Sequence, residues 1–192
     1  VPPEVVRDPV GPLGLDLDGQ RPPLHRPQPG PRVAPLLRLR AELDQLDRAT
    51  FYDAPDSLTS VEGRYDERGW HYYALFGSGD EPADAARRTR CPLTTAACRS
   101  IPGLANAGFS RFLPGTHLYP HRGELSGVLR CHLGLVVPDG DVAIRFGDDV
   151  RTWREGHCLV FDDTFEHEAW NHAATERVVL LVTFRPGLLA GG

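Results

Sequence analysis

The sequence predicts a mainly β fold, a sandwich or barrel of short strands with a few flanking helices. From residue 106 onward, short apolar or alternating segments recur roughly every eight to twelve residues. Turn-forming triplets separate them at 138–140, 147–149 and 154–156. The chain has 192 residues, with 41% hydrophobic and 24% charged residues, which is typical of one soluble globular domain.

Each expected strand is a short segment rich in β-branched, aromatic or alternating apolar residues. The expected strands are 70–76, 107–113, 116–121, 127–137, 141–146, 150–153, 157–161, 167–170 and 177–184. Leucines at three- and four-residue steps predict an amphipathic helix over 36–48. A short helix is expected at 94–99, after Pro92, and residues 77–90 are expected to form a surface loop.

Residues 1–35 differ from the rest because they contain ten of the 18 prolines. Such a segment holds neither a helix nor a central strand, so it is expected to be an extended proline-rich arm. Leu13, Leu15 and Leu17 alternate in it and suggest one short edge strand. Residues 36–192 are then expected to form the single folded domain.

Composition excludes several classes of function. The net charge of −5 makes nucleic acid an unsuitable partner, and without lysine no Schiff base can form. No apolar run is long enough for a membrane span, and no secretory signal is visible, so a cytoplasmic location is expected. The four cysteines form no CxxC pair and are expected to be buried thiols, with a Cys91–Cys98 bridge as the alternative. The oligomeric state stays open.

Strand periodicity places polar residues on one face of segment 127–137. Val128, Arg130, His132 and Gly134 point one way, and apolar side chains point the other way, as in a strand that lines a polar cavity. Arg177 heads a similar face of 177–184 and is expected at its mouth end. A buried guanidinium needs an anionic partner, either a ligand carboxylate or a side chain such as Asp162 or Asp163.

Two histidines are candidate metal ligands. His121 and His167 lie 46 positions apart at strand ends, and imidazole nitrogens suit iron. The usual non-haem iron site adds a carboxylate two residues after the first histidine, but here that position is Gly123. Glu124 would face the other way on a strand. Water or a co-substrate would therefore have to complete the coordination.

Three segments together resemble the aspartyl/asparaginyl β-hydroxylase family of iron(II)/2-oxoglutarate-dependent oxygenases. They are PGTHLYPHRG (114–123), RCHLGLVVP (130–138) and WREGHCLVFDDTFEHEAWN (153–171), followed by Arg177. The resemblance covers about 90–187. It implies a double-stranded β-helix, a cupin-like jelly roll, and a family that lacks the acid at the position of Gly123.

The resemblance also implies a role for each candidate site residue. His121 and His167 would hold Fe(II), and Arg177, with Ser110, would bind the distal carboxylate of 2-oxoglutarate. Arg130 and His132 would bind the carboxylate beside its keto group. O2 would be the oxidant, and succinate and CO2 would leave as a hydroxyl group is added to an unactivated C–H bond.

The substrate is expected to be an Asp/Asn-like amino acid, free or in a peptide or carrier-bound form, hydroxylated at the β-carbon. Val128 stands where the peptide-directed members carry a basic residue, so recognition is expected to differ here. A halogenase of the same iron class and a non-catalytic metal-binding cupin are the alternatives. The remaining acids, histidines and tryptophans near the motifs are expected to shape loops or pack: Asp162, Asp163, Glu166, His117, His157, His172, Trp153 and Trp170.

Overall fold

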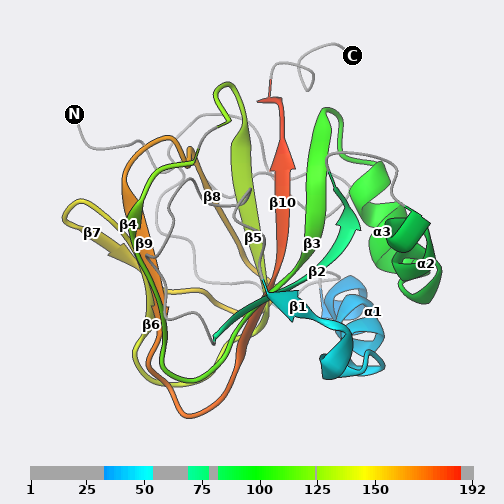
Figure 1. The fold of residues 1–192 in the computed structure, drawn as a ribbon, viewed down its shortest axis with the longest axis horizontal. Helices are drawn as coiled ribbons and strands as arrows, with labels where there is room; N and C mark the ends of the chain where they lie inside the picture. The colour runs from blue at the N-terminus through cyan, green and yellow to red at the C-terminus, as the bar shows by residue number, and fades with distance from the viewer. Residues whose placement is uncertain (1–32, 54–68, 78–81, 124, 187–192) are drawn as a thin grey trace.

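Two antiparallel sheets face each other, and helices cover the outer side of the larger sheet (Figure 1). This computed structural model describes residues 33–53, 69–77, 82–123 and 125–186. The larger sheet has six strands in the order β1 (Tyr52–Asp53), β2 (Trp70–Phe76), β3 (Leu104–Phe112), β10 (Arg177–Phe184), β5 (Leu129–Val136) and β8 (Cys158–Phe161). The smaller has four, in the order β4 (Thr116–His121), β9 (His167–Asn171), β6 (Val142–Phe146) and β7 (Asp149–Arg151). The predicted mainly β fold is confirmed.

Alternate residues of the larger sheet serve two separate cores. On β5, Cys131, Leu133 and Leu135 join an outer core beneath the helices. Arg130 and His132, which alternate with them along the strand, line a pocket between the two sheets. The predicted division of this strand into an apolar and a polar face is therefore confirmed.

The helices differ most from the sequence prediction. Residues 77–90 do not form a loop throughout, because α2 spans Pro82–Arg90. Its first turn holds Asp84 and its last turn holds arginines, which suits the helix dipole, and Pro82 is tolerated at the start. The helix has almost no apolar stripe, so periodicity did not reveal it.

The other helical boundaries shift by a few residues. Helix α1 spans Val33–Asp44, followed by a short 3-10 helix at Arg48–Thr50, rather than one helix over 36–48. Helix α3 is Pro92–Arg99. Residues 33–35, which were predicted to belong to the proline-rich arm, are part of α1. Residues 1–32, with the predicted edge strand, lie outside the described residues. No helix of the described part is long and apolar enough to span a membrane.

A buried carboxylate joins two of the helices. Glu42 of α1 is 7% exposed and accepts hydrogen bonds from the backbone N–H groups of Leu93 and Thr94, at 2.7 and 2.8 Å. It also accepts one from the Thr94 hydroxyl at 2.7 Å. The carboxylate therefore caps the N-terminus of α3, where unpaired N–H groups and the helix dipole favour a negative charge.

All four cysteines are free thiols, and the Cys91–Cys98 bridge does not form. Cys91, Cys98 and Cys131 lie in the outer core. Burial raises the pKa of Cys91 and of Cys98 to about 12, so both are protonated and unreactive at neutral pH.

Candidate functional site

The two candidate metal ligands meet where the smaller sheet faces the pocket. His121 ends β4, His167 begins β9, and they are paired across the two strands. Their ring centroids are 4.2 Å apart, and the residues are 5% and 7% exposed. In each ring Nδ1 lies against a backbone carbonyl two residues earlier, that of Tyr119 at 2.8 Å and that of Phe165 at 2.9 Å. With Nδ1 as the donor, Nε2 is the basic nitrogen of each imidazole.

The surroundings keep His167 uncharged. Burial, followed by the proximity of His121, lowers the pKa of His167 to about 3. The aromatic rings of Phe146 and Phe161 lie 5.6 and 5.4 Å from the His167 ring. A neutral imidazole is the form that binds a metal ion, so the geometry and the charge state both suit metal binding.

Gly123 is closely covered by a neighbouring acid. Its N–H donates to the carbonyl of Asp163 at 2.6 Å, and an ideal Cβ at Gly123 would lie 2.2 Å from Asp163 Oδ2. No side chain fits there without displacing that carboxylate. Among the described residues, no group of three or more His, Cys, Asp or Glu is arranged to hold a metal ion. The protein would supply two ligands.

Asp163 is itself part of this site, although the sequence suggested a role in loop shape or as an ion-pair partner of Arg177. It is 1% exposed, its Oδ2 contacts Nε of Arg130, and its Oδ1 has no hydrogen-bond partner. Its neighbour Asp162 does shape the loop, because its carboxylate accepts from the backbone N–H and the hydroxyl of Thr164. The two adjacent acids therefore do different things.

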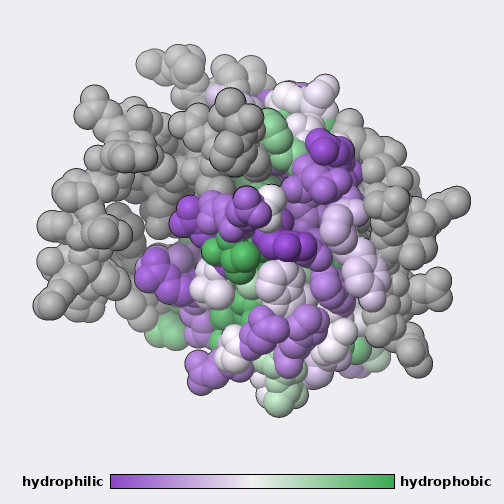
Figure 2. Space-filling model, turned by 90° about the vertical axis from the view of Figure 1, so that its left-hand side faces the viewer, coloured by the Kyte–Doolittle hydropathy of each residue, from purple (hydrophilic) through white to green (hydrophobic). Residues whose placement is uncertain are grey.

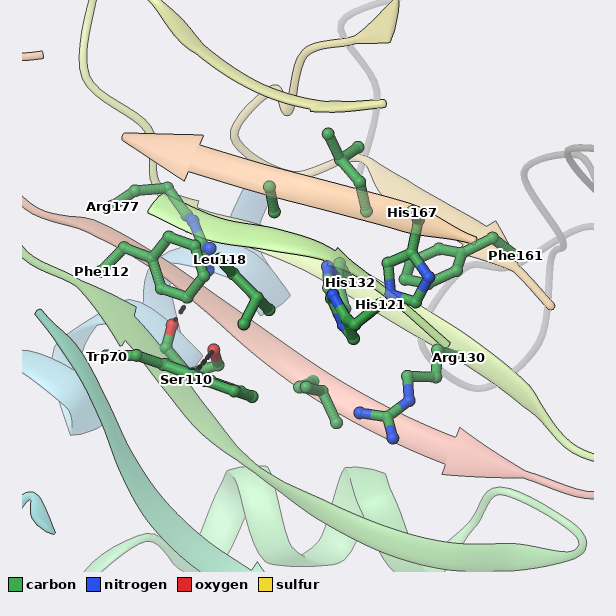
Figure 3. Close-up of a pocket in the computed structure, with 13 residues that line it drawn as sticks. Trp70, Ser110, Phe112, Leu118, His121, Arg130, His132, Phe161, His167 and Arg177 are labelled. Atoms are coloured by element: carbon green, nitrogen blue, oxygen red, sulfur yellow. Dashed lines mark hydrogen bonds between the residues drawn. The ribbon is translucent and has the colours of Figure 1, made fainter. Parts of the chain in front are cut away.

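Arg177 is buried in the pocket, whereas the sequence predicted it at the mouth end of its strand. The residue is 1% exposed, and its guanidinium lies over the ring of Phe112, at 3.8 Å from the ring centroid (Figure 3). It also lies 4.5 Å from the ring centroid of Trp153. Its NH1 donates to the backbone carbonyl of Ser110 at 3.4 Å, and its Nε has no partner. Neither Asp162 nor Asp163 pairs with it.

Burial lowers the pKa of Arg177 to about 9, since nothing compensates the charge fully. The group still carries its charge at neutral pH. The Ser110 hydroxyl lies nearby and accepts a hydrogen bond from the indole of Trp70 at 3.0 Å, which leaves its own proton available. A buried guanidinium of this kind is completed by an anionic ligand.

His132 and Arg130 line the pocket from β5. Figure 3 shows Arg177, Phe112 and Ser110 at one end, Arg130 at the other, and His132 between them beside His121 and His167. His132 is 8% exposed, and neither of its ring nitrogens has a hydrogen-bond partner. Burial and then the charges of Arg177 and Arg130 hold its pKa well below the usual value. Two residues that line the pocket, His132 and Arg177, thus carry side-chain nitrogens without a hydrogen-bond partner among the described residues.

The histidines expected not to bind metal lie elsewhere. The face of the molecule on the side of the smaller sheet is mostly hydrophilic (Figure 2). His117 stacks on Tyr119 with ring centroids 4.6 Å apart and contacts Glu168 at 2.9 Å. His172 contacts the carboxylate of Asp141 at 2.9 Å. His157 lies against a backbone carbonyl, that of Glu155, at 3.0 Å.

Comparison with known proteins agrees with this geometry. The model of the family described as aspartyl/asparaginyl beta-hydroxylase matches residues 36–186. This chain belongs to that family. A Rhizobium tropici protein named ornithine lipid ester-linked acyl 2-hydroxylase is 43% identical over 153 residues, 76% of this chain and 53% of that protein. The mouse aspartyl/asparaginyl beta-hydroxylase is 37% identical over 132 residues, 65% of this chain and 17% of that protein.

A solved structure shows the same fold. The crystal structure of a Pseudomonas putida prolyl-4-hydroxylase aligns with a TM-score of 0.51 and 17% identity, covering 81% of this chain and 88% of that one. The predicted double-stranded β-helix is thereby confirmed for this member of the aspartyl/asparaginyl β-hydroxylase family.

Two residues of the site were not predicted as such. Trp153 was expected only to pack, but its indole covers one face of the Arg177 guanidinium. Asp163 was expected to shape a loop. The sequence offered one signal for Asp163: it is an acid four residues before His167, in a chain that lacks the usual acid two residues after His121. Sequence reasoning did not connect Asp163 with that missing acid.

Proposed function

We propose that this chain is an iron(II)- and 2-oxoglutarate-dependent hydroxylase. The single observation that carries the proposal is one pocket that holds a pair of facing histidines and a buried guanidinium with no anionic partner among the described residues. A cupin that kept a metal only for structure would have no need of Arg177 in this state. Loss of its charge would cost such a protein nothing.

The residues fit each component in turn. His121 and His167 would hold Fe(II) through Nε2, and the backbone carbonyls at Nδ1 fix the ring orientation. Arg177 would bind the distal carboxylate of 2-oxoglutarate, with the Ser110 hydroxyl as a second donor. His132 and Arg130 would bind the other carboxylate. Iron with 2-oxoglutarate and O2 supplies the oxidising power for hydroxylation of a C–H bond, and the apolar walls keep water away from it.

Asp163 favours hydroxylation over halogenation. The missing acid at Gly123 would leave room for chloride only if the space beside it were empty or positively charged. Instead the Asp163 carboxylate fills that space. A second anion beside a buried carboxylate is repelled, so a halide site there is unfavourable.

We infer that the substrate is an acyl chain attached through an ester. The Rhizobium tropici relative acts, by its name, on an ester-linked acyl group, and it shares more of this chain than the mouse relative does. The described pocket lining contains two guanidiniums, of which Arg177 suits the co-substrate and Arg130 contacts Asp163. An Asp/Asn-like residue, free or in a peptide or carrier-bound form, is the second candidate, favoured by the mouse relative.

The proposal is tested by succinate formation in the presence of Fe(II), 2-oxoglutarate and O2, together with product mass. We expect the wild-type protein to release succinate and to add one oxygen atom to an acyl ester. His121→Ala and His167→Ala should each lower turnover by about a hundredfold or more, which is about 2.7 kcal/mol in the barrier. His157→Ala is the matched control and should retain turnover, since that ring contacts only a backbone carbonyl.

Equal turnover in His121→Ala and wild type would refute the metal assignment. A product that gains chlorine in place of oxygen when chloride is added would refute hydroxylation while keeping the iron site. Oxygen gain on aspartyl peptides and none on acyl esters would select the second substrate class.

A further inference from the structure

Two buried hydroxyl groups on the inner face of the larger sheet have no role in the site described so far. Thr183 is 0% exposed and Tyr72 is 3% exposed. Neither Thr183 Oγ1 nor the Tyr72 hydroxyl has a hydrogen-bond partner in the part of the chain that the structure describes. Buried polar groups are normally satisfied, and valine and phenylalanine would fill these spaces without the cost of an unpaired hydroxyl. Because both lie on the face that carries the pocket, and not in the outer core, they are candidates to bind a ligand.

Thr183 lies on the same face of β10 as two residues that line the pocket, Arg177 and Leu181. The residue paired with Thr183 on β5 is Arg130, which also lines the pocket, and its partner on β3 is Asn106. The side-chain oxygen of Asn106 is likewise buried without a partner. Thr183 thus lies beside the Arg130 end of the pocket, away from Arg177.

Tyr72 reaches the same region from β2. It is paired with Ser110, and its neighbour on the same face is Trp70; both of these line the pocket. Its ring leans over Gly108, where an ideal Cβ would lie 2.6 Å from Tyr72 Cζ and 2.7 Å from its hydroxyl oxygen. Gly108 is paired with Leu181 and precedes Ser110 on the inner face of β3. The Tyr72 hydroxyl therefore lies over Gly108, and Thr183 is paired with the next inward-facing residue of β3, Asn106.

The groups around these two hydroxyls carry no unpaired charge. Burial raises the pKa of Tyr72 far above its usual value, so the phenol stays protonated and can donate. The guanidinium opposite Thr183 contacts the carboxylate of Asp163. Two hydroxyl donors without an unpaired charge suit an uncharged acceptor, such as the carbonyl oxygen of an ester, better than a carboxylate.

We propose that the hydroxyls of Tyr72 and Thr183 bind the ester carbonyl of the substrate and so direct the carbon beside that carbonyl towards His121 and His167. This rests on the proposed function and deepens it, because it names the groups that select an acyl ester. Leu181 would contact the acyl chain between the two.

The test compares two probes that differ only at the carbonyl: O-octanoyl-N-acetylserine and its ether, O-octyl-N-acetylserine. Their dissociation constants are measured by calorimetry on iron-free protein with 2-oxoglutarate present, so that no turnover occurs. We expect the wild-type protein to bind the ester about tenfold more tightly than the ether, since a site built to hydrogen-bond a group rejects the analogue that lacks it. Tyr72→Phe and Thr183→Val should each reduce that ratio to about threefold or less.

Tyr73→Phe is the matched control. It removes the same atom from the next residue, whose hydroxyl is also buried without a partner but lies in the outer core. We expect it to keep the wild-type ratio. Equal affinity of the wild-type protein for both probes would overturn the proposal without any variant, and so would an unchanged ratio in both Tyr72→Phe and Thr183→Val.

Succinate release by the wild-type protein, measured with Fe(II), 2-oxoglutarate, O2 and the ester probe as substrate, tests the hydroxylase separately. Succinate release with no discrimination between the probes removes only the carbonyl subsite. Discrimination without succinate release removes the hydroxylase and leaves an ester-binding pocket.

Discussion

The two faces of the larger sheet come from the same strands and serve opposite purposes. On β10, Val178, Leu180 and Val182 point into the outer core, where apolar side chains fill the space beneath the helices. Arg177 and Thr183 point inward and carry polar atoms without partners. Packing on the outer face stabilises the fold, whereas the unpartnered polar groups on the inner face lower its stability but can bind a ligand. A stability cost confined to one face is what a binding site on a rigid scaffold requires.

The largest expected effect separates adjacent leucines of β10. Leu180 is 0% exposed in the outer core, and Leu181 is 2% exposed and lines the pocket. Leu180→Ala should lower the free energy of unfolding by about 2–5 kcal/mol through lost burial and a cavity. It should leave the KM for 2-oxoglutarate unchanged, whereas Leu181→Ala should alter both quantities. Denaturant unfolding and succinate kinetics at a temperature where both variants are folded measure this; a changed KM in Leu180→Ala would show that the two faces are coupled.

On the inner face we expect a substitution to leave the stability of the fold unchanged or to raise it slightly. Arg177→Met should raise the 2-oxoglutarate requirement by about tenfold or more, because a charge-assisted contact of about 1.5–3 kcal/mol is lost. Without 2-oxoglutarate the variant should unfold at the same temperature as wild type or a few degrees higher, since an uncompensated buried charge is gone.

The pKa of Arg177 determines at which pH its buried charge lowers the stability of the fold. The pKa of Arg177 is lowered to about 9 in the folded state, so the unfolded chain binds the proton more tightly. The cost is fully present below pH 9 and fades only as the pH rises above it. At neutral pH the substitution removes all of it. Arg111→Met, which breaks a contact with Glu176, is the control; it should lower stability and spare the 2-oxoglutarate requirement. A marked drop in the melting temperature of ligand-free Arg177→Met would contradict this account.

The sequence predicted which residues lie on the inner face better than it predicted the contacts between them. Strand periodicity alone placed Arg130 and His132 together, and strands 70–76, 116–121 and 177–184 have the predicted bounds. The contact between Arg130 and Asp163 joins residues 33 positions apart, and the position of Trp153 over Arg177 depends on how a loop returns to the sheet. Such contacts depend on the packing of the two sheets, which local pattern does not encode. Helix α2 was missed for a different reason, since a charged helix lacks the apolar stripe by which helices are recognised.

The smallest effect belongs to the scaffold behind the outer face. Glu42→Gln keeps the shape of the side chain and removes the charge that caps α3. We expect the free energy of unfolding to fall by about 1–2 kcal/mol, because charge-assisted hydrogen bonds at a helix N-terminus become neutral ones in a buried place. Asp44→Asn, two residues further along α1, is the control. Its carboxylate is half exposed and contacts Arg40, so its loss should cost only a few tenths of a kcal/mol. Thermal unfolding of both variants decides the point: equal losses would mean that the carboxylate of Glu42 does not anchor α3, whereas a larger loss in Glu42→Gln with unchanged succinate kinetics would place its effect in the scaffold alone.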